Sequence, residues 1–503
     1  MRASILSAPR LRYIVLLLSS LLLVFWLHSK TILFNGLSYT SDIVNFTQSA
    51  KSIWIGQPFL WNNQFGGTSY NHNYFLIVFL GPLVLLMGSY GLFAVSLLLN
   101  LLASYALLPP ATQITYQKLA SSSLLIFVFL IGPIGYWVWD DPLYGWHIEN
   151  LFLPLIVLLG VTTLHNSRWW CFWALLLILV REEGVLVALT TILVVDYVAG
   201  SRSLMATLWA RRRTILCLSL IFIGGLLLLR AYGDLGRARM DSSFSQLALC
   251  WADKERFALL VGNFTSFLWL LSPAWISFIT LRPSRAVGVI LCTLPLIAVS
   301  LISTLAYFPN PAVLTAHGMT WGCRFSYIWG IYLVAITCAI NKSQPTQRFS
   351  PLGLLAPMAA AAFVFQIYFL RTERSYVYEE RFFSAYHTRL LPIKLLSKTE
   401  RKLTRCLARV VPHSTPVIVP GLLWGNFHRH WTMSSESAEQ WNLRPEILIC
   451  SAHAGMPYQK PCIEYFAKLD SKHFQTVEVE NMRVAWQSQW NDLIQKCLSN
   501  TRN

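Results

Sequence analysis

Charged residues are scarce in this chain, and acidic residues are the scarcest. Only 13% of the 503 residues are charged, whereas soluble proteins carry about 25%. Hydrophobic residues make up 55% of the chain and gather in long uncharged runs such as 14–27 and 151–163. Several runs approach the roughly 20 residues that a helix needs to cross a bilayer. The composition therefore argues against a soluble protein and predicts a membrane protein with about eleven spanning helices.

Metal-binding cysteine patterns and a cleavable signal peptide are also missing. The ten cysteines show no CxxC spacing, so the sequence predicts no zinc or haem site. Cys450 and Cys462 can form a disulfide if they lie outside the cell, but two reduced, buried thiols are the interpretation that we favour from sequence. No small-residue cleavage site follows the first apolar run, so we predict an uncleaved first span.

The net charge of +17 comes from basic residues in short loops between the apolar runs. They do not form one stripe, so we expect membrane lipid and no nucleic acid as the partner. The apolar segment 74–87 decides the topology, because every later basic loop changes side if it spans. It is short and interrupted by Gly81-Pro82, and the positive-inside rule favours a re-entrant or interfacial helix over a span. The loops that then face the cytoplasm carry Lys118, Arg168, Arg202, Arg211, Arg212, Arg213, Arg282, Arg285, Lys342 and Arg348.

This topology predicts a plasma (inner) membrane protein with a cytoplasmic N-terminus. The membrane domain covers residues 1–370, and a polar domain outside the cytoplasm covers 371–503. The predicted spans are 11–28, 92–108, 119–139, 151–165, 169–180, 185–198, 215–229, 264–281, 287–307, 325–340 and 352–370.

The polar C-terminal region alternates predicted strands and helices. Apolar residues at helical spacing predict a helix over 399–411, and a second helix is expected over 462–469. Short buried strands are predicted at 416–420, 447–450 and 476–479. The pattern indicates a small α/β domain appended to an all-helical, polytopic membrane domain.

The first outer loop contains one acid, Asp42, which is the only acidic residue before Asp140. A single carboxylate just beyond a span can act as a general base or hold a cation. Alternatively, Ser41 or Asp42 caps a helix that runs through Gln48 to Trp54, and both interpretations can hold at once. The loop continues to a polar stretch that includes His72.

Two further groups of charged residues stand out. The second outer loop contains His147 and Glu149, which suit acid–base work or the handling of phosphate or metal; a merely interfacial loop with an aromatic belt is the alternative. Arg181, Glu182 and Glu183 interrupt a long apolar run. Charge at membrane depth is costly, so this turn is a candidate site, with a structural ion pair as the alternative.

Taken together, these motifs resemble those of the GT-C superfamily of membrane glycosyltransferases. Within it, they are similar to a branch of bacterial membrane proteins described only as a domain of unknown function. The matching stretches are 42–48 with Gly56 and His72, 147–149 with Pro154, and 180–183. Ile148 stands where the branch has proline, Arg181 where it has lysine, and Glu183 where it has aspartate.

The resemblance covers roughly residues 11–370 and implies a helical bundle whose outward-facing cavity is roofed by helices of the first loop. It implies a polyprenyl-phosphate-linked sugar as donor and transfer with inversion. Asp42, His147 and Glu149 are the expected catalytic residues, and Asp42 with Glu149 could hold Mg²⁺ or Mn²⁺. The expected ligands of substrate or lipid phosphate are Gln48, His72, Arg181, Glu182, Glu183, His317 and Arg324.

Two other functions fit the same pattern. In a transporter or lipid flippase, the buried Arg-Glu-Glu turn would be the coupling site, although the chain shows no convincing inverted repeat. In a membrane scaffold, the helices would merely present the outer domain. Transfer of labelled sugar from a lipid carrier separates an enzyme from both.

Overall fold

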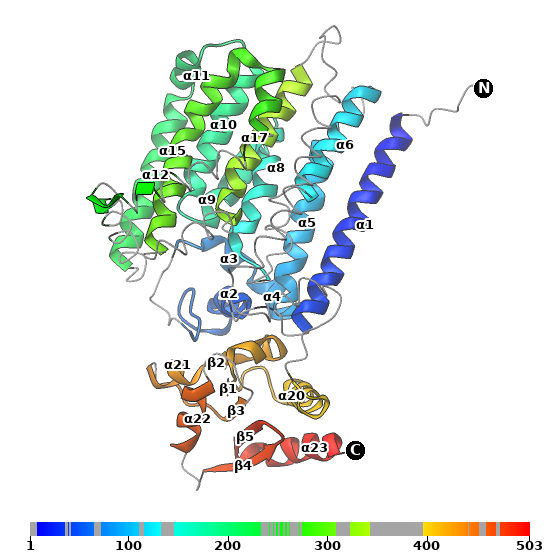
Figure 1. Cartoon of the computed structure of the whole chain (residues 1–503), viewed down its shortest axis with the longest axis vertical. Coiled ribbons are helices and arrows are strands. Elements are labelled where there is room, and N and C mark those ends of the chain that lie inside the picture. Colours follow the sequence, from blue (N-terminus) through cyan, green and yellow to red (C-terminus); the bar gives the residue numbers. More distant parts are fainter. Residues whose placement is uncertain are drawn as a thin grey trace, which may run out of the picture.

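The computed structural model describes residues 8–35, 39, 42–64, 72–109, 115–131, 145–232, 274–307, 322–342, 396–440, 442–451, 459–468 and 473–502, with isolated residues between 241 and 271. A helical bundle forms the upper part of Figure 1, and a small domain with a sheet lies below it. The bundle helices are α1 (Ala8–Asn35), α2 (Asp42–Lys51), η1 (Ile53–Ile55), α3 (Phe75–Phe79), α4 (Gly81–Met87), α5 (Tyr90–Leu107), α6 (Tyr116–Ile131), η4 (Ile148–Leu151), α8 (Phe152–Leu164), α9 (Trp170–Val180), α10 (Gly184–Ala199), α11 (Leu204–Ala210), α12 (Arg212–Tyr232), α15 (Pro283–Tyr307) and α17 (Gly322–Lys342).

Helices α8 and α17 form the centre of the bundle. Nearly every side chain of α8 is buried, which fits its uniformly apolar sequence. Gly160 on α8 lies directly against Val334 on α17, and a Cβ placed on Gly330 would come within 3.0 Å of Leu153. Small residues at these crossings let the two helices approach closely, as is common where helices pack within membranes.

Four described helices are long and apolar enough to cross a membrane, by length and composition: Arg10–Asn35, Tyr90–Leu107, Arg212–Ala231 and Pro283–Ser300. Shorter apolar helices lie at several other predicted spans. The long helices expose large apolar side chains; Leu17 is 59% exposed, Leu216 61% and Val287 69%. Water would disfavour apolar surfaces of this extent. The predicted span 352–370 and most of 264–281 lie outside the described residues.

The two segments that we expected not to cross as single helices are both broken. Residues 74–87 form α3 and α4, which have five and seven residues and meet at Gly81. The long run from 169 to 198 divides into α9 and α10 at the Arg181–Glu183 turn. Gly184 begins α10 where a Cβ would collide with the carbonyl oxygen of Leu177, so the close approach of the two helices requires glycine.

The C-terminal domain is built on a five-stranded mixed sheet with the order β2-β1-β3-β5-β4. β1 pairs in parallel with β2 and β3, whereas β5 pairs antiparallel with β3 and β4. The predicted strands and helices are confirmed, but β2 and β5 were not predicted. The elements are α20 (Lys398–Val410), β1 (Pro416–Ile418), η6 (Gly421–Phe427), β2 (Trp431–Met433), α21 (Ser435–Gln440), β3 (Ile447–Ser451), α22 (Gln459–Ala467), β4 (Phe474–Val479), β5 (Met482–Gln487), η7 (Ser488–Trp490) and α23 (Asn491–Arg502).

Two disulfides join the elements of this domain. Cys450 of β3 is bonded to Cys462 of α22, so the reduced thiols that we favoured from sequence are wrong. Cys406 of α20 is bonded to Cys497 of α23, a pair that the sequence did not suggest. In contrast, Cys171, Cys217, Cys292 and Cys338, which are the described cysteines of the bundle, are free thiols. The disulfides are typical of an oxidising compartment.

Candidate functional site

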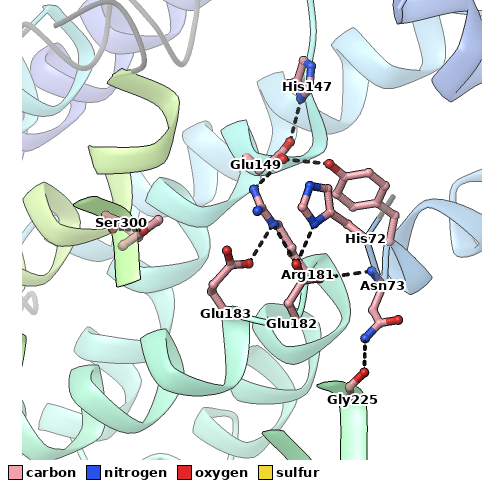
Figure 2. Close-up of polar contacts among 11 residues, drawn as sticks. His72, Asn73, His147, Glu149, Arg181, Glu182, Glu183, Gly225 and Ser300 are labelled. Carbon is pink, nitrogen blue, oxygen red and sulfur yellow. Dashed lines mark hydrogen bonds and ion pairs between the residues drawn. The ribbon is translucent and has the colours of Figure 1, made fainter. Parts of the chain in front are cut away.

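A buried network of charged side chains lies where three separate segments meet inside the bundle (Figure 2). His72 and Asn73 come from the stretch before α3. His147 and Glu149 come from the residues that precede α8. The third segment is the turn between α9 and α10. Figure 2 shows these side chains pointing toward one another, so the sequence motifs at 72, 147–149 and 181–183 form one constellation.

Glu149 is the centre of one half of the network and is 5% exposed. Its Oε2 lies 2.7 Å from Nδ1 of His147, and its Oε1 accepts hydrogen bonds from the Tyr74 hydroxyl at 2.9 Å and from Arg181 Nη1 at 3.1 Å. A buried carboxylate needs such partners because desolvation disfavours its charge. The three contacting groups fix the position of Glu149 and, through it, the orientation of the His147 ring.

Arg181 and Glu182 connect this half to the first outer loop. Nε of Arg181 lies 2.7 Å from Glu183 Oε2 and 3.4 Å from Glu182 Oε1. The Glu182 carboxylate in turn lies 2.6 Å from His72 Nδ1 and accepts the backbone N–H of Asn73 at 3.1 Å. The arginine thus balances three carboxylates rather than one. Its 5% exposure leaves it poorly placed to hold a ligand phosphate.

His147 is the most accessible side chain of the ion-paired group, with 21% of its surface exposed. Its ring packs edge-to-face on Phe46, with 4.8 Å between centroids. Phe46 lies one helical turn after Asp42, which is the first residue of α2. Residues four apart share a helix face, so Asp42 is on the side of α2 that is turned toward His147.

The network lies at the end of α8–α10 that is remote from the basic loops. Arg211 pairs with Asp196 near the far end of α10, and Arg285 donates a hydrogen bond to the Gly200 carbonyl at 3.1 Å. Sixteen residues of α10 separate that basic end from the Arg181–Glu183 turn. At 1.5 Å per residue, the separation along the axis is about 24 Å. The C-terminal domain lies beyond the end of the bundle at which the network is found (Figure 1).

The other predicted site residues are not part of this group. Gln48 is fully buried, and its amide donates hydrogen bonds to the carbonyl and hydroxyl oxygens of Thr432 in β2, at 2.7 and 2.9 Å. It therefore holds α2 to the C-terminal domain. Arg324 belongs to α17, but its side chain, like the whole of His317, lies outside the described residues.

A divalent cation does not fit Glu149 in this geometry. Both carboxylate oxygens already contact His147, Tyr74 or Arg181, and the guanidinium group 3.1 Å away repels a cation. Among the described residues, no three His, Cys, Asp or Glu side chains are grouped to hold a metal ion.

Tyr74 and Asn73 are the members of the network that the sequence did not single out for this purpose. In the sequence, Tyr74 is an ordinary aromatic residue at the start of an apolar segment. Only the contact of its hydroxyl with Glu149 shows that it belongs to the network. Asn73 also donates from its side chain to the Gly225 carbonyl of α12 at 2.9 Å. Such contacts join residues more than 70 positions apart, so local patterns carry no sign of them.

No protein-family model, curated protein or solved structure matches this chain. The geometry of the network and the side of the bundle where it lies are therefore the features that bear on function.

Proposed function

We propose that this chain is a membrane glycosyltransferase that moves a sugar from a polyprenyl-phosphate carrier to an acceptor hydroxyl on the outer face of the membrane. The observation that carries the proposal is the His147–Glu149 pair. It is held rigidly by Arg181 and Tyr74, yet its imidazole is the exposed member. Such a pair suits proton abstraction, because the carboxylate orients the ring and stabilises the imidazolium that forms.

The reaction is a direct displacement. The acceptor oxygen attacks the anomeric carbon, the bond from that carbon to the phosphate oxygen breaks, and the lipid phosphate leaves with the electron pair. His147 takes the acceptor proton, and Glu149 stabilises the resulting charge. Asp42, on the α2 face that is turned toward His147, is the second candidate base. Because phosphate is already a good leaving group, orientation of the two reactants supplies much of the rate enhancement.

Two further features support the outer face as the place of reaction. The domain next to the network contains both described disulfides, whereas the described bundle cysteines are free. The basic loops gather about 24 Å away at the other end of α10, as the positive-inside rule expects of a cytoplasmic face.

A transporter is the second candidate function, and the broken helix favours it. α9 and α10 are interrupted by three buried charged residues, and broken helices of this kind form substrate and ion sites in secondary transporters. The His147–Glu149 pair has no evident task in that mechanism, so the enzyme remains the better-supported proposal.

The test is sugar transfer by purified protein in proteoliposomes, using a panel of radiolabelled polyprenyl-phosphate sugars. We expect His147→Gln and Asp42→Asn each to remain folded. Whichever of the two residues is the base, its variant should lose about 10²–10⁴-fold in turnover. Asparagine is also a good N-cap, so Asp42→Asn separates the base from the cap. No transfer by the unmodified protein, together with uptake of a solute into the vesicles, would replace the enzyme with the transporter.

A further inference from the structure

A cavity of about 460 Å³ lies between the first-loop helices and the C-terminal domain. It is on the opposite side of α2 from the charged network. Phe46 faces His147, whereas Thr47 and Lys51 line the cavity. The C-terminal domain supplies the other wall from the segments around β1 and β2. The cavity is therefore a separate site, and the proposed sugar transfer assigns it no task.

The lining of this cavity is rich in positive charge. The cations Lys51, Arg429 and Arg444 line it beside His413 and His428, and no carboxylate is among the described lining residues. Lys51 is 5% exposed, and its ammonium group donates to the carbonyl oxygens of Arg429 at 2.7 Å and His430 at 3.2 Å. These two hydrogen bonds hold its ammonium group in place at the cavity wall, and an anion bound there would offset part of the cost of burying its charge.

The cations of the cavity also affect the pKa values of its two histidines. Burial first, and then the charges of Arg429 and Lys51, lower the pKa of His428 to about 3. The same causes, in the same order, lower the pKa of the more exposed His413. Burial also lowers the pKa of Lys51 to about 8. An anion in the cavity would compensate these charges.

One edge of the cavity is apolar and continues onto an exposed apolar surface. Ile55, Val84 and Leu85 line the cavity, and the adjacent Leu86 is 74% exposed. The Trp54 side chain lies against Gly81 and donates to the Val78 carbonyl at 2.8 Å, which joins η1 to α3 and α4. We call the exposed residues of η1 and α4 the apolar rim: Ile53, Trp54, Ile55, Leu85, Leu86 and Met87.

Basic groups beside an apolar surface match a ligand with a phosphate head and a hydrocarbon chain. We propose that the cavity binds the phosphate of such an amphiphile, with its chain lying along the apolar rim. Arg429 and Arg444 are the exposed arginines that can grip phosphate oxygens with paired N–H donors, and Lys51 supplies a fixed point charge. The apolar rim is the type of surface that lies at a membrane interface. The proposal stands whether or not sugar transfer is the activity.

Binding can be measured by calorimetry on the full chain in a non-ionic maltoside detergent. The probes are dioctanoyl phosphatidylglycerol, dioctanoyl phosphatidylcholine and inorganic phosphate. The test variant is Arg429→Gln/Arg444→Gln. Its matched control, Lys402→Gln/Arg405→Gln, removes the same charge from exposed positions of α20 that do not line the cavity. We expect the anionic lipid to bind, the test variant to weaken binding at least ten-fold, and the control to leave it unchanged.

The probes separate the two sources of phosphate. Inorganic phosphate that binds as tightly as the anionic lipid, with the same loss in the test variant, would support the anion site and assign its ligand to the soluble phase. The proposal is overturned if phosphatidylcholine binds as tightly as phosphatidylglycerol, if the control weakens binding as much as the test variant, or if the folded, unmodified chain binds none of the probes.

Discussion

Arg181 places one guanidinium group among three carboxylates in the interior of the bundle. Its contacts with Glu149, Glu182 and Glu183 span 2.7–3.4 Å, and all four residues are at most 9% exposed. The network therefore depends on this cation as much as on any acid. A role in positioning Glu149 follows, because the guanidinium group holds the same carboxylate oxygen as the Tyr74 hydroxyl.

Replacing Arg181 with methionine should be strongly destabilising. The change leaves three buried carboxylates without their shared partner, and breaking a buried ion pair in this way costs about 3–5 kcal/mol. Thermal unfolding in detergent measures the effect. Arg211→Met is the matched control. Arg211 pairs with Asp196 at 2.5 Å, but their side chains are 31% and 26% exposed and therefore less buried than those of the network. Exposed pairs contribute about 0–1 kcal/mol. Equal midpoint shifts in the two variants would show that burial does not set the strength of the network.

Much of the network could be predicted from sequence because buried charge is rare in apolar runs. The Arg181–Glu183 turn stood out for that reason, whereas His72, His147 and Glu149 stood out as polar residues of the predicted outer loops. The structure brings all of them together. The side chain of Gln48, in contrast, contacts Thr432 of the C-terminal domain, which the sequence did not suggest. The sequence around Gln48 contains no signal for a partner 384 residues away.

Among the helices and strands too, features with a local sequence signal could be predicted and those without one could not. The breaks in 74–87 and 169–198 were predictable, because Gly81-Pro82 and a charged turn interrupt apolar periodicity. Strands β2 and β5 were missed: β2 has three residues, which is too short for a period to show, and β5 contains charged and polar residues. The Cys406–Cys497 bond joins helices 91 positions apart, so only the tertiary fold reveals it.

The segment that connects η6 to β2 attaches the C-terminal domain to the bundle through histidines. Nδ1 of His428 accepts the backbone N–H of Ser89 at 3.0 Å. Gly88 adopts a positive φ of 61° directly against the His428 ring, where a larger residue would be strained and would collide. His430, 1% exposed, donates from Nε2 to the Val411 carbonyl at 3.0 Å. The half-buried His428 therefore contacts the bundle, whereas the buried imidazole of His430 holds the same segment to Val411 within the C-terminal domain.

Acidification should destabilise the C-terminal domain around His430. Burial, as the largest cause, lowers the pKa of His430 from 6.5 to about 4. Between these values the unfolded chain binds a proton that the folded chain does not, so stability is full above pH 6.5 and falls as the pH drops toward 4. The difference corresponds to about 3 kcal/mol.

Thermal unfolding of His430→Gln between pH 7.5 and 4.5 should show a flatter pH dependence than the parent, because glutamine keeps an N–H donor for Val411 and does not titrate. His473→Gln, at an exposed position before β4, is the control and should follow the parent. A pH dependence in His430→Gln as steep as that of the parent would assign the acid sensitivity to other groups.

At the scale of the whole molecule, α1 fixes which end of the bundle lies beside the C-terminal domain. Its 28 residues extend about 42 Å, which is enough to cross a bilayer once. Phe34, near its end, packs edge-to-face on His428 with 5.3 Å between ring centroids. The start of α1 lies at the opposite end of the bundle, on the side of α11 (Figure 1). If α1 spans, the N-terminus and the C-terminal domain must lie on opposite sides of the membrane, whatever the path of residues 343–395.

Reporter fusions test this arrangement directly. The basic residues near α11 and the start of α12 should face the cytoplasm, because cytoplasmic loops carry the excess of lysine and arginine. A reporter that is active only outside the cytoplasm should therefore be active when fused after Asn503, and a reporter that is active only inside should be active when fused at Arg212. Exchanging the two reporters is the control and should abolish both signals. A cytoplasmic signal at Asn503 would place the disulfide-bonded domain in a reducing compartment. It would also place the charged network on the cytoplasmic side and contradict the proposed transfer on the outer face.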